Sequence, residues 1–351
     1  MREPHGTIKG RGAAGNPQGR FEKLERDSEM KTEIPSRPET VITLQAARSI
    51  IARNDSPDLP FNQSINPYQG CEHGCIYCYA RPSHAYLGLS PGLEFETRIF
   101  AKDNAAEVLR RELSRPGYRC ELISLGANTD PYQPAERKLQ ITRSVLEVLW
   151  EFRHPVGIVT KGSLVERDAD ILEAMAREDL VQVFVSIGSL DGEIARTLEP
   201  RASAPYRRVE TIRRLSARGV PCGTLVAPII PFLNDKDMES VLEAVSQAGA
   251  TSAGYTLLRL PWEVRGLFKD WLERHHALKA RHIMARIRDM RGGRENDPEF
   301  GARMKGEGQY ADLLQRRFEL ACRRFGLNAR ERFQPDTHRF RGPGPAQARL
   351  F

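Results

Sequence analysis

Short apolar segments alternate with longer amphipathic ones from residue 61 to about residue 260. The short segments are rich in β-branched residues and are bounded by turn residues, which predicts strands at 64–67, 121–126, 155–160, 181–187, 221–227 and 251–258. Helical periodicity between them predicts helices at 103–114, 137–152, 165–177, 204–218 and 235–248. Repeated strand–helix units favour an α/β fold with a parallel sheet, either wrapped as a barrel or open and doubly wound. In both arrangements the chemistry lies beyond the carboxyl ends of the strands.

The segments that flank this alternation differ from it in composition. The start of the chain is rich in Gly, Pro and charge and lacks hydrophobic periodicity, so we expect it to be disordered. After the alternation, two basic helices are expected at 263–291 and 307–325, followed by an Arg-, Pro- and Gly-rich end. The expected divisions are a disordered lead at 1–40, a barrel at 41–260, a basic helical extension at 261–327 and a flexible tail at 328–351.

Positive charge is concentrated in the last quarter of the chain. Residues 263–351 contain 20 Lys and Arg against 12 Asp and Glu, whereas the rest of the chain contains 33 against 34. A polyanion such as nucleic acid is therefore a plausible partner of residues 263–351. A solvated basic face on helices explains the same excess equally well.

The six cysteines and the start of the chain indicate a reducing compartment. No apolar run is long enough to span a bilayer, and no apolar segment with a cleavage site follows Met1. We therefore expect a cytoplasmic protein without a disulfide framework. In such a compartment, a tight cysteine cluster points to metal or redox chemistry.

The segment NPYQGCEHGCIYCYARP, residues 66–82, places three thiols within eight positions, at Cys71, Cys75 and Cys78. Thiolates are the ligands of iron–sulfur clusters and of zinc. Three ligands fill three corners of a four-iron cluster and leave one iron open. Zinc sites usually take four ligands in paired motifs, and the sequence has no second pair. Zinc and a plain electron-transfer cluster remain the alternatives at this point.

This Cys-x3-Cys-x2-Cys pattern, with an aromatic residue before the last cysteine, resembles the signature of the radical S-adenosylmethionine (radical SAM) superfamily. The resemblance implies a partial (βα)6 TIM-like barrel and a 4Fe–4S cluster held by Cys71, Cys75 and Cys78. In that superfamily S-adenosylmethionine binds the open iron and is cleaved by an electron from the cluster. The product is a 5′-deoxyadenosyl radical that removes a hydrogen atom from the substrate. An external reductant, flavodoxin or ferredoxin, is then implied as a partner.

The resemblance also assigns cofactor contacts at the ends of successive strands. Tyr77 matches the aromatic position that lies against the adenine, and Thr129 and Asp130 match the place where the cofactor's amino group is met. Lys161 would face the cofactor carboxylate, and Ser186 would bind the ribose.

Three further residues near these positions are weaker candidates. Glu199 and Arg201, in Leu-Glu-Pro-Arg, could contribute to the cofactor site, but a salt bridge within their loop explains them as well. His73, inside the cysteine segment, is expected to lie on the surface or to face the substrate.

Within the superfamily, the chain is similar to an uncharacterised branch related to spore photoproduct lyases, which act on DNA. Those lyases carry a cysteine after the second strand, where this chain has Ala127, Asn128 and Thr129. We therefore expect a lyase or transferase type of reaction on nucleic acid, such as repair or base modification, rather than photoproduct lyase activity itself. The alternatives are a radical enzyme for a small molecule or peptide, and a non-catalytic metal-binding or electron-transfer module.

The last residues resemble a peptide that docks on the bacterial sliding clamp. Such peptides carry a glutamine followed by a Leu-Phe pair, here Gln347, Leu350 and Phe351. The alternative is a tail that docks on its own domain.

Overall fold

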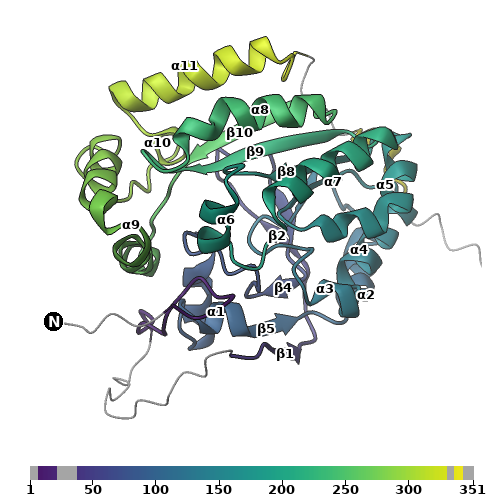
Figure 1. Cartoon of the computed structure of the whole chain (residues 1–351). Helices are drawn as coiled ribbons and strands as arrows, with labels where there is room; N and C mark the ends of the chain where they lie inside the picture. The colour runs from purple at the N-terminus through teal and green to yellow at the C-terminus, as the bar shows by residue number, and fades with distance from the viewer. Residues whose placement is uncertain (1–6, 22–37, 330–335, 343–351) are drawn as a thin grey trace, which may run out of the picture.

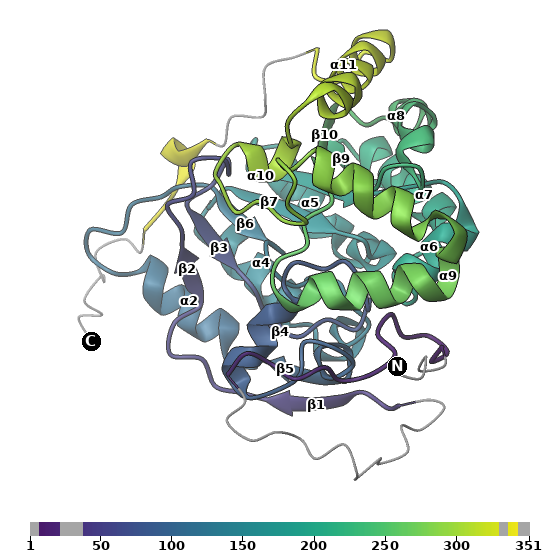
Figure 2. The ribbon, with the colours of Figure 1, turned by 90° about the vertical axis from the view of Figure 1, so that its left-hand side faces the viewer.

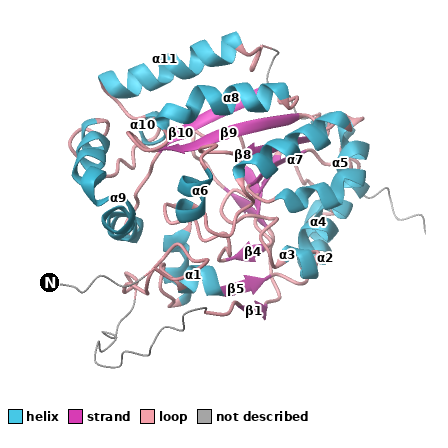
Figure 3. Cartoon of the chain, in the orientation of Figure 1, coloured by secondary structure: helices cyan, strands magenta, loops and turns pink. Residues whose placement is uncertain are grey.

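The computed structural model describes residues 7–21, 38–329 and 336–342, and its centre is a seven-stranded sheet of order β10-β9-β8-β7-β6-β3-β2 (Figures 1 and 3). The strands are β2 (Ile51–Arg53), β3 (Gln63–Ile65), β6 (Ile123–Leu125), β7 (Val156–Thr160), β8 (Val181–Ser186), β9 (Cys222–Ile229) and β10 (Ser252–Leu257). Each neighbouring pair from β3 to β10 is parallel, and β2 joins β3 antiparallel at the edge. The predicted α/β fold with a mostly parallel sheet is confirmed.

Helices cover the outer face of this sheet, and every helix predicted between its strands is present (Figure 1). They are α2 (Ala105–Leu113), α4 (Ile141–Glu151), α5 (Ala169–Ala176), α7 (Pro205–Ala217) and α8 (Met238–Gln247), with the short α3 (Glu136–Leu139) before α4. The sequence did not predict α6 (Gly192–Leu198), because seven residues make too few turns to show a period. Asp191 caps α6 by accepting from the backbone N–H groups of Glu193 and Ile194.

A second, three-stranded sheet of order β1-β5-β4 was not predicted either. It consists of β1 (Val41–Leu44), β5 (Arg98–Ala101) and β4 (Tyr68–Gln69). These strands are two to four residues long and come from distant parts of the chain, so no local pattern marks them. Strand β4 leads directly into residues 70–80, which we call the cysteine loop. The 3-10 helix η1 (Arg81–Leu87) and α1 (Glu94–Thr97) follow that loop.

Residues 7–21 lie against the cysteine loop, although the sequence predicted a disordered lead at 1–40 (Figure 2). They form no helix or strand, but the backbone N–H groups of Gly12 and Ala13 donate to the buried carboxylate of Glu96, at 3.0 and 2.9 Å. A Cβ on Gly12 would lie 2.0 Å from the carbonyl oxygen of Gly74, so only glycine fits there. Contacts with later residues, rather than local periodicity, order this segment. Residues 1–6 and 22–37 of the lead lie outside the described ranges.

The C-terminal extension packs on the barrel through α9 (Glu263–Asp289), α10 (Ala302–Lys305) and α11 (Gln309–Arg324). Helix α9 bends at His276, whose backbone is non-helical (φ −143°, ψ 40°), and Figure 2 shows its two arms meeting at a corner. The first arm shares a hydrophobic cluster with Ile76 and Tyr77 of the cysteine loop, and its contributions are Val264, Leu267, Phe268, Trp271 and Leu272. The first arm and the cysteine loop therefore pack in one core.

Two other predictions concern membranes and the end of the chain. Over the described ranges, no helix combines the length and the apolar character needed to cross a membrane. The proposed clamp-binding residues Gln347, Leu350 and Phe351 lie outside those ranges, as does most of the predicted tail.

The shared core gives a testable expectation for Trp271, which is fully buried and donates its indole N–H to the carbonyl of Thr197 at 3.0 Å. Trp271→Ala should lower the free energy of unfolding by about 3–5 kcal/mol, because it removes a large buried side chain. The matched control, Leu278→Ala, changes a fully exposed residue on the second arm and should have an effect below about 0.5 kcal/mol. Urea unfolding followed by circular dichroism measures both, and a native-like Trp271→Ala protein would contradict the shared core.

Candidate cofactor site

The cysteine loop holds its three thiols on a tightly wound backbone. Cys71 and Cys75 are buried and Cys78 is half-buried, and all three are free thiols. The N–H of Cys71 donates to the carbonyl of Phe95 at 2.9 Å, and the N–H of Cys78 donates to that of Cys75 at 3.2 Å. Gly74 has a φ of +67°, and a Cβ there would lie 2.7 Å from the Glu96 carboxylate. The loop can thus be built only with glycine at this turn.

The arrangement of the thiols fits an iron–sulfur cluster better than a zinc ion. They are close enough that charge on Cys75 or Cys78 contributes to raising the pKa of Cys71, after the larger effect of burial. Among the described residues, however, no three His, Cys, Asp or Glu side chains converge on a single-ion site. Zinc sites usually take four ligands. The cysteine loop supplies three thiols, which is the donor set of a four-iron cluster with one open iron.

Burial also sets the protonation of the Cys75 thiol. It is the largest effect raising the pKa of Cys75 to about 12, and the neighbouring Lys161 only partly offsets it. Without bound metal the thiol is therefore neutral at physiological pH. Metal binding removes the proton, because the thiolate is the ligand.

His73 links the cysteine loop to the sheet. Its Nδ1 lies 3.2 Å from Oδ2 of Asp130, and its side chain is buried. The expectation that His73 lies on the surface is wrong, because its side chain is buried and this contact turns the ring toward the sheet.

Asp130 accepts hydrogen bonds from three further groups at the carboxyl ends of β6 and β7. The hydroxyl of Thr160 and the N–H of Lys161 donate to it at 2.7 Å each, and the N–H of Tyr132 donates at 2.9 Å. Burial acts to raise the pKa of Asp130, but His73 and these hydrogen bonds outweigh it and lower the pKa to about 2. The carboxylate is therefore ionised and holds two strand ends and the cysteine loop together.

Thr129 is buried beside Asp130 and faces the start of the cysteine loop. Its hydroxyl donates to the carbonyl of Tyr68 in β4 at 2.8 Å, and its N–H donates to Oδ1 of Asn66 at 3.3 Å. The structure thus brings Thr129 and Asp130 next to the cysteines, as the order of the strands predicts. Their side chains are engaged in bonds that hold the loop.

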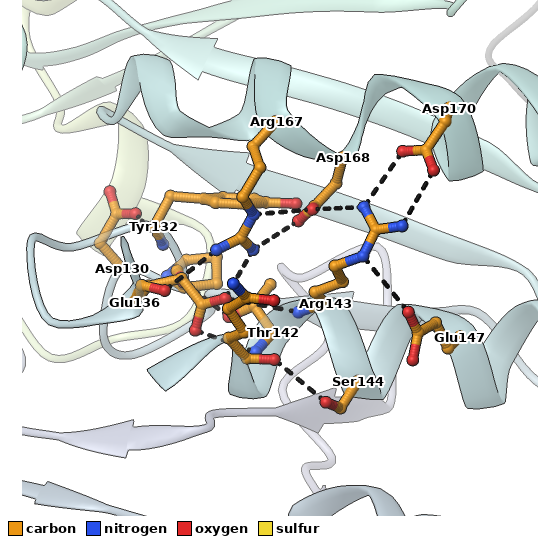
Figure 4. A network of polar contacts seen from close by, with 12 residues as sticks. Asp130, Tyr132, Glu136, Thr142, Arg143, Ser144, Glu147, Arg167, Asp168 and Asp170 are labelled. Atoms are coloured by element: carbon orange, nitrogen blue, oxygen red, sulfur yellow. Dashed lines mark hydrogen bonds and ion pairs between the residues drawn. The ribbon is translucent and has the colours of Figure 1, made fainter. Parts of the chain in front are cut away.

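A charge network behind this region fixes the loop that connects β6 to α4 (Figure 4). The buried carboxylate of Glu136 accepts from the hydroxyl of Tyr68 and pairs with Arg167 at 2.7 Å. Arg167 also pairs with Asp168 at 2.8 Å, and Arg143 reaches the same aspartate at 3.1 Å. The network therefore connects α4 and α5 to the strand that precedes the cysteine loop.

Tyr77 and Lys161 meet on the sheet side of the cysteine loop. The hydroxyl of Tyr77 donates to the buried carboxylate of Glu199, which pairs with the buried guanidinium of Arg208. The Nζ of Lys161 lies 5.8 Å from the centroid of the Tyr77 ring. Burial acts to lower the pKa of Lys161, but charge on Cys75 and Glu199 outweighs it and raises the pKa. Lys161 is thus a charged ammonium, and within the described chain its Nζ forms no ion pair or hydrogen bond.

Ser186 lies at the end of β8, next to the end of β7 that carries Lys161. Its hydroxyl donates to the carbonyl of Ala227 at 3.3 Å, and its own carbonyl accepts from Arg208 at 2.9 Å. Sequence reasoning missed Arg208, because nothing in a basic helix marks one arginine as buried. It did single out Leu-Glu-Pro-Arg, in which Glu199 reaches Tyr77 while Arg201 pairs with Glu72 at 3.0 Å.

Two curated relatives of this chain carry no assigned function. An uncharacterized protein of Mycobacterium tuberculosis is 38% identical over 234 residues, which cover 66% of this chain and 68% of that protein. An uncharacterized protein of Methanocaldococcus jannaschii is 26% identical over 171 residues, covering 49% of this chain and 61% of the other.

The fold is also similar to that of spore photoproduct lyase. The lyase complexed with dinucleoside spore photoproduct has a TM-score of 0.60 at 16% identity, and a doubly substituted form of the lyase with bound AdoMet and the same dinucleoside has a TM-score of 0.54. Both matches cover 82% of this chain and 80% of the other. The sequence model described as Radical SAM superfamily matches residues 65–245, which is more than half of the chain. This protein therefore belongs to the radical SAM superfamily, whose cofactors are a 4Fe–4S cluster and S-adenosylmethionine.

Proposed function

We propose that this protein is a radical S-adenosylmethionine enzyme that acts on nucleic acid, with its cluster held by Cys71, Cys75 and Cys78. The observation that carries the proposal is the three-thiol loop beside the unpaired ammonium of Lys161, at the carboxyl ends of parallel strands. When bound, the cluster and S-adenosylmethionine supply one-electron cleavage of a sulfonium and a carbon radical that removes hydrogen from the substrate. The chain supplies the ligands, the counter-charge and the exclusion of water.

Lys161 is the counter-charge for the carboxylate of S-adenosylmethionine. Its raised pKa keeps the ammonium charged, and without an ion pair in the described chain it is available to a carboxylate. The Tyr77 ring, held in place by Glu199, is the surface for the adenine, and Ser186 on the neighbouring strand is the contact for the ribose. Thr129 and Asp130 hold the region that meets the cofactor's amino group, and Asp130 positions the cysteine loop through His73.

Exposed aromatic rings near the strand ends support a nucleic-acid substrate. Trp262 follows β10 and is 60% exposed, and the guanidinium of Arg20 lies 3.9 Å from its ring centroid. Tyr86 in η1 is 72% exposed, and Phe21 packs on it at 5.0 Å. Exposed rings interleaved with arginine suit the stacking of unpaired bases. Together with the basic excess of residues 263–351, they favour nucleic acid over a small molecule or a peptide.

The cluster assignment predicts the behaviour of single cysteine variants. Replacing Cys71, Cys75 or Cys78 by Ala should abolish both the iron–sulfur absorption after anaerobic reconstitution and the release of 5′-deoxyadenosine under dithionite. Cys120→Ser removes a half-buried thiol just before β6 and should keep both properties. A native protein that binds a cluster but never cleaves S-adenosylmethionine would instead be an electron-transfer module.

The role of Lys161 predicts a specific loss of cofactor affinity. Lys161→Gln should raise the Kd for S-adenosylmethionine about 10- to 100-fold, because it removes a charge-assisted contact worth about 1.5–3 kcal/mol. Lys161→Arg should recover part of the affinity, since it restores the charge. Lys138→Gln, at an exposed position in α3, is the control of equal charge. Calorimetry on the cluster-loaded native protein and the three variants measures each Kd, and an unchanged value for Lys161→Gln would remove the assignment.

The substrate class predicts which compounds stimulate turnover. Single-stranded oligonucleotides should increase the rate of 5′-deoxyadenosine release by the native protein, and Trp262→Ala should reduce that increase while leaving the basal rate unchanged. Tyr206→Ala is the control, because Tyr206 is 76% exposed on α7. Stimulation by peptides or small metabolites but by no oligonucleotide would contradict the proposal.

A further inference from the structure

Two surface cavities of similar size differ in how their positive charges are balanced. The first, of about 640 Å³, has three arginines in its lining, and every one of them pairs with a carboxylate. Arg207 pairs with Glu166 at 2.8 Å, Arg214 with Glu210 at 3.0 Å, and Arg213 also with Glu210. Each of its cations is thus already held in an ion pair within the protein, and none is free to meet an anion.

The second cavity, which we call the lysine cleft, has a volume of about 610 Å³. Its lining residues are Phe232, Asp235, Lys236, Lys279, His282 and Arg317. Over the described ranges, neither lysine ammonium takes part in an ion pair or a hydrogen bond, and the ring of His282 makes only an aromatic contact. The cleft therefore presents two unbalanced ammonium groups beside an imidazole.

The acidic group in the lysine cleft does not cancel these charges. Asp235 accepts from the hydroxyl of Tyr310, and Arg317 pairs with Glu239 at 2.7 Å. Arg317 also donates to the backbone carbonyl of Asp235 at 2.9 Å, which fixes the two residues relative to each other. One carboxylate thus stands against two free lysines, and the cleft carries a net positive charge that attracts an anion.

The floor of the lysine cleft is aromatic. The ring of Phe232 stacks on that of His282 with centroids 4.1 Å apart, and it also contacts the ring of Tyr310 at 5.6 Å. Phe232 has a φ of +60°, a left-handed conformation that is costly for a bulky residue. Such backbone persists only where the surrounding packing enforces it, and it concentrates at functional positions.

The position of the lysine cleft relates it to the cofactor site. Phe232 and Lys236 lie between β9 and α8, beyond the carboxyl end of β9, and this is the side of the sheet on which Lys161 and Ser186 lie. Lys279 comes from the second arm of α9. The cleft therefore lies between the strand ends and the basic extension. A nucleic-acid chain with one nucleotide inside the barrel would pass over this cleft.

We propose that the lysine cleft binds a phosphodiester of the nucleic-acid substrate. The inference rests on the proposed function and adds a phosphate contact outside the cofactor site. Phosphate matches the cleft because Lys236 and Lys279 are flexible point charges that can approach one anionic group from two sides. The start of α8, next to Lys236, adds favourable N–H dipoles.

The test compares oligonucleotide binding by two double variants of the cluster-loaded protein. Lys236→Gln/Lys279→Gln should weaken binding of a labelled single-stranded oligonucleotide by about tenfold or more, measured by fluorescence anisotropy. It should also reduce the slope of log K against log salt by about 0.7, since one phosphate contact is lost. The charge-matched control, Lys138→Gln/Arg115→Gln, changes exposed residues away from the cleft and should bind like the native protein.

Basal release of 5′-deoxyadenosine separates this inference from the proposed function. The Lys236→Gln/Lys279→Gln variant should keep the native basal rate, because neither lysine contacts the cofactor site. Native affinity and salt slope in that variant, or equal weakening in the control, would overturn the phosphate site alone. Failure of the native protein to bind any oligonucleotide would overturn the nucleic-acid substrate itself.

Discussion

The contact between His73 and Asp130 is the constraint on which the arrangement of the site depends. It joins a loop wound around three cysteines to the ends of two parallel strands, which bring Lys161 into the same region. The low pKa of Asp130 means that its carboxylate carries a charge in this connection across the physiological range. Together with the bond from the Thr129 hydroxyl to the carbonyl of Tyr68, it fixes the thiols relative to the strand ends.

Two buried arginines near the cysteine loop are balanced by carboxylates. Arg81 pairs with Glu96 and Arg208 with Glu199, so burial is compensated within each pair. Lys161 lies among these groups and has no such partner inside the described chain. In the proposed site, this ammonium is therefore the group left free to meet an anion from outside. The same reasoning distinguishes the lysine cleft from the arginine-lined cavity of similar size.

Local pattern and parallel topology account for what could be predicted. The ranges 155–160 and 181–187 were expected as strands from periodicity, and the rule that parallel strands end at one edge then placed Lys161 and Ser186 together. Partners far apart in the chain could not be predicted in this way. Glu96 meets Gly12 across 84 positions, and nothing near either residue announces the other. The bend of α9 at His276 lacks a glycine or proline that would mark it.

Residues 7–21 pack against the cysteine loop, although they lie outside the region that the superfamily model matches. The superfamily match begins at residue 65, yet the carboxylate of Glu96 accepts from the backbone of Gly12 and Ala13, and its carbonyl accepts from Arg11. A protein trimmed to the matched region would leave a buried carboxylate without two of its donors, directly behind the turn at Gly74. The region matched by the superfamily model is therefore shorter than the set of residues that pack together around the cysteine loop.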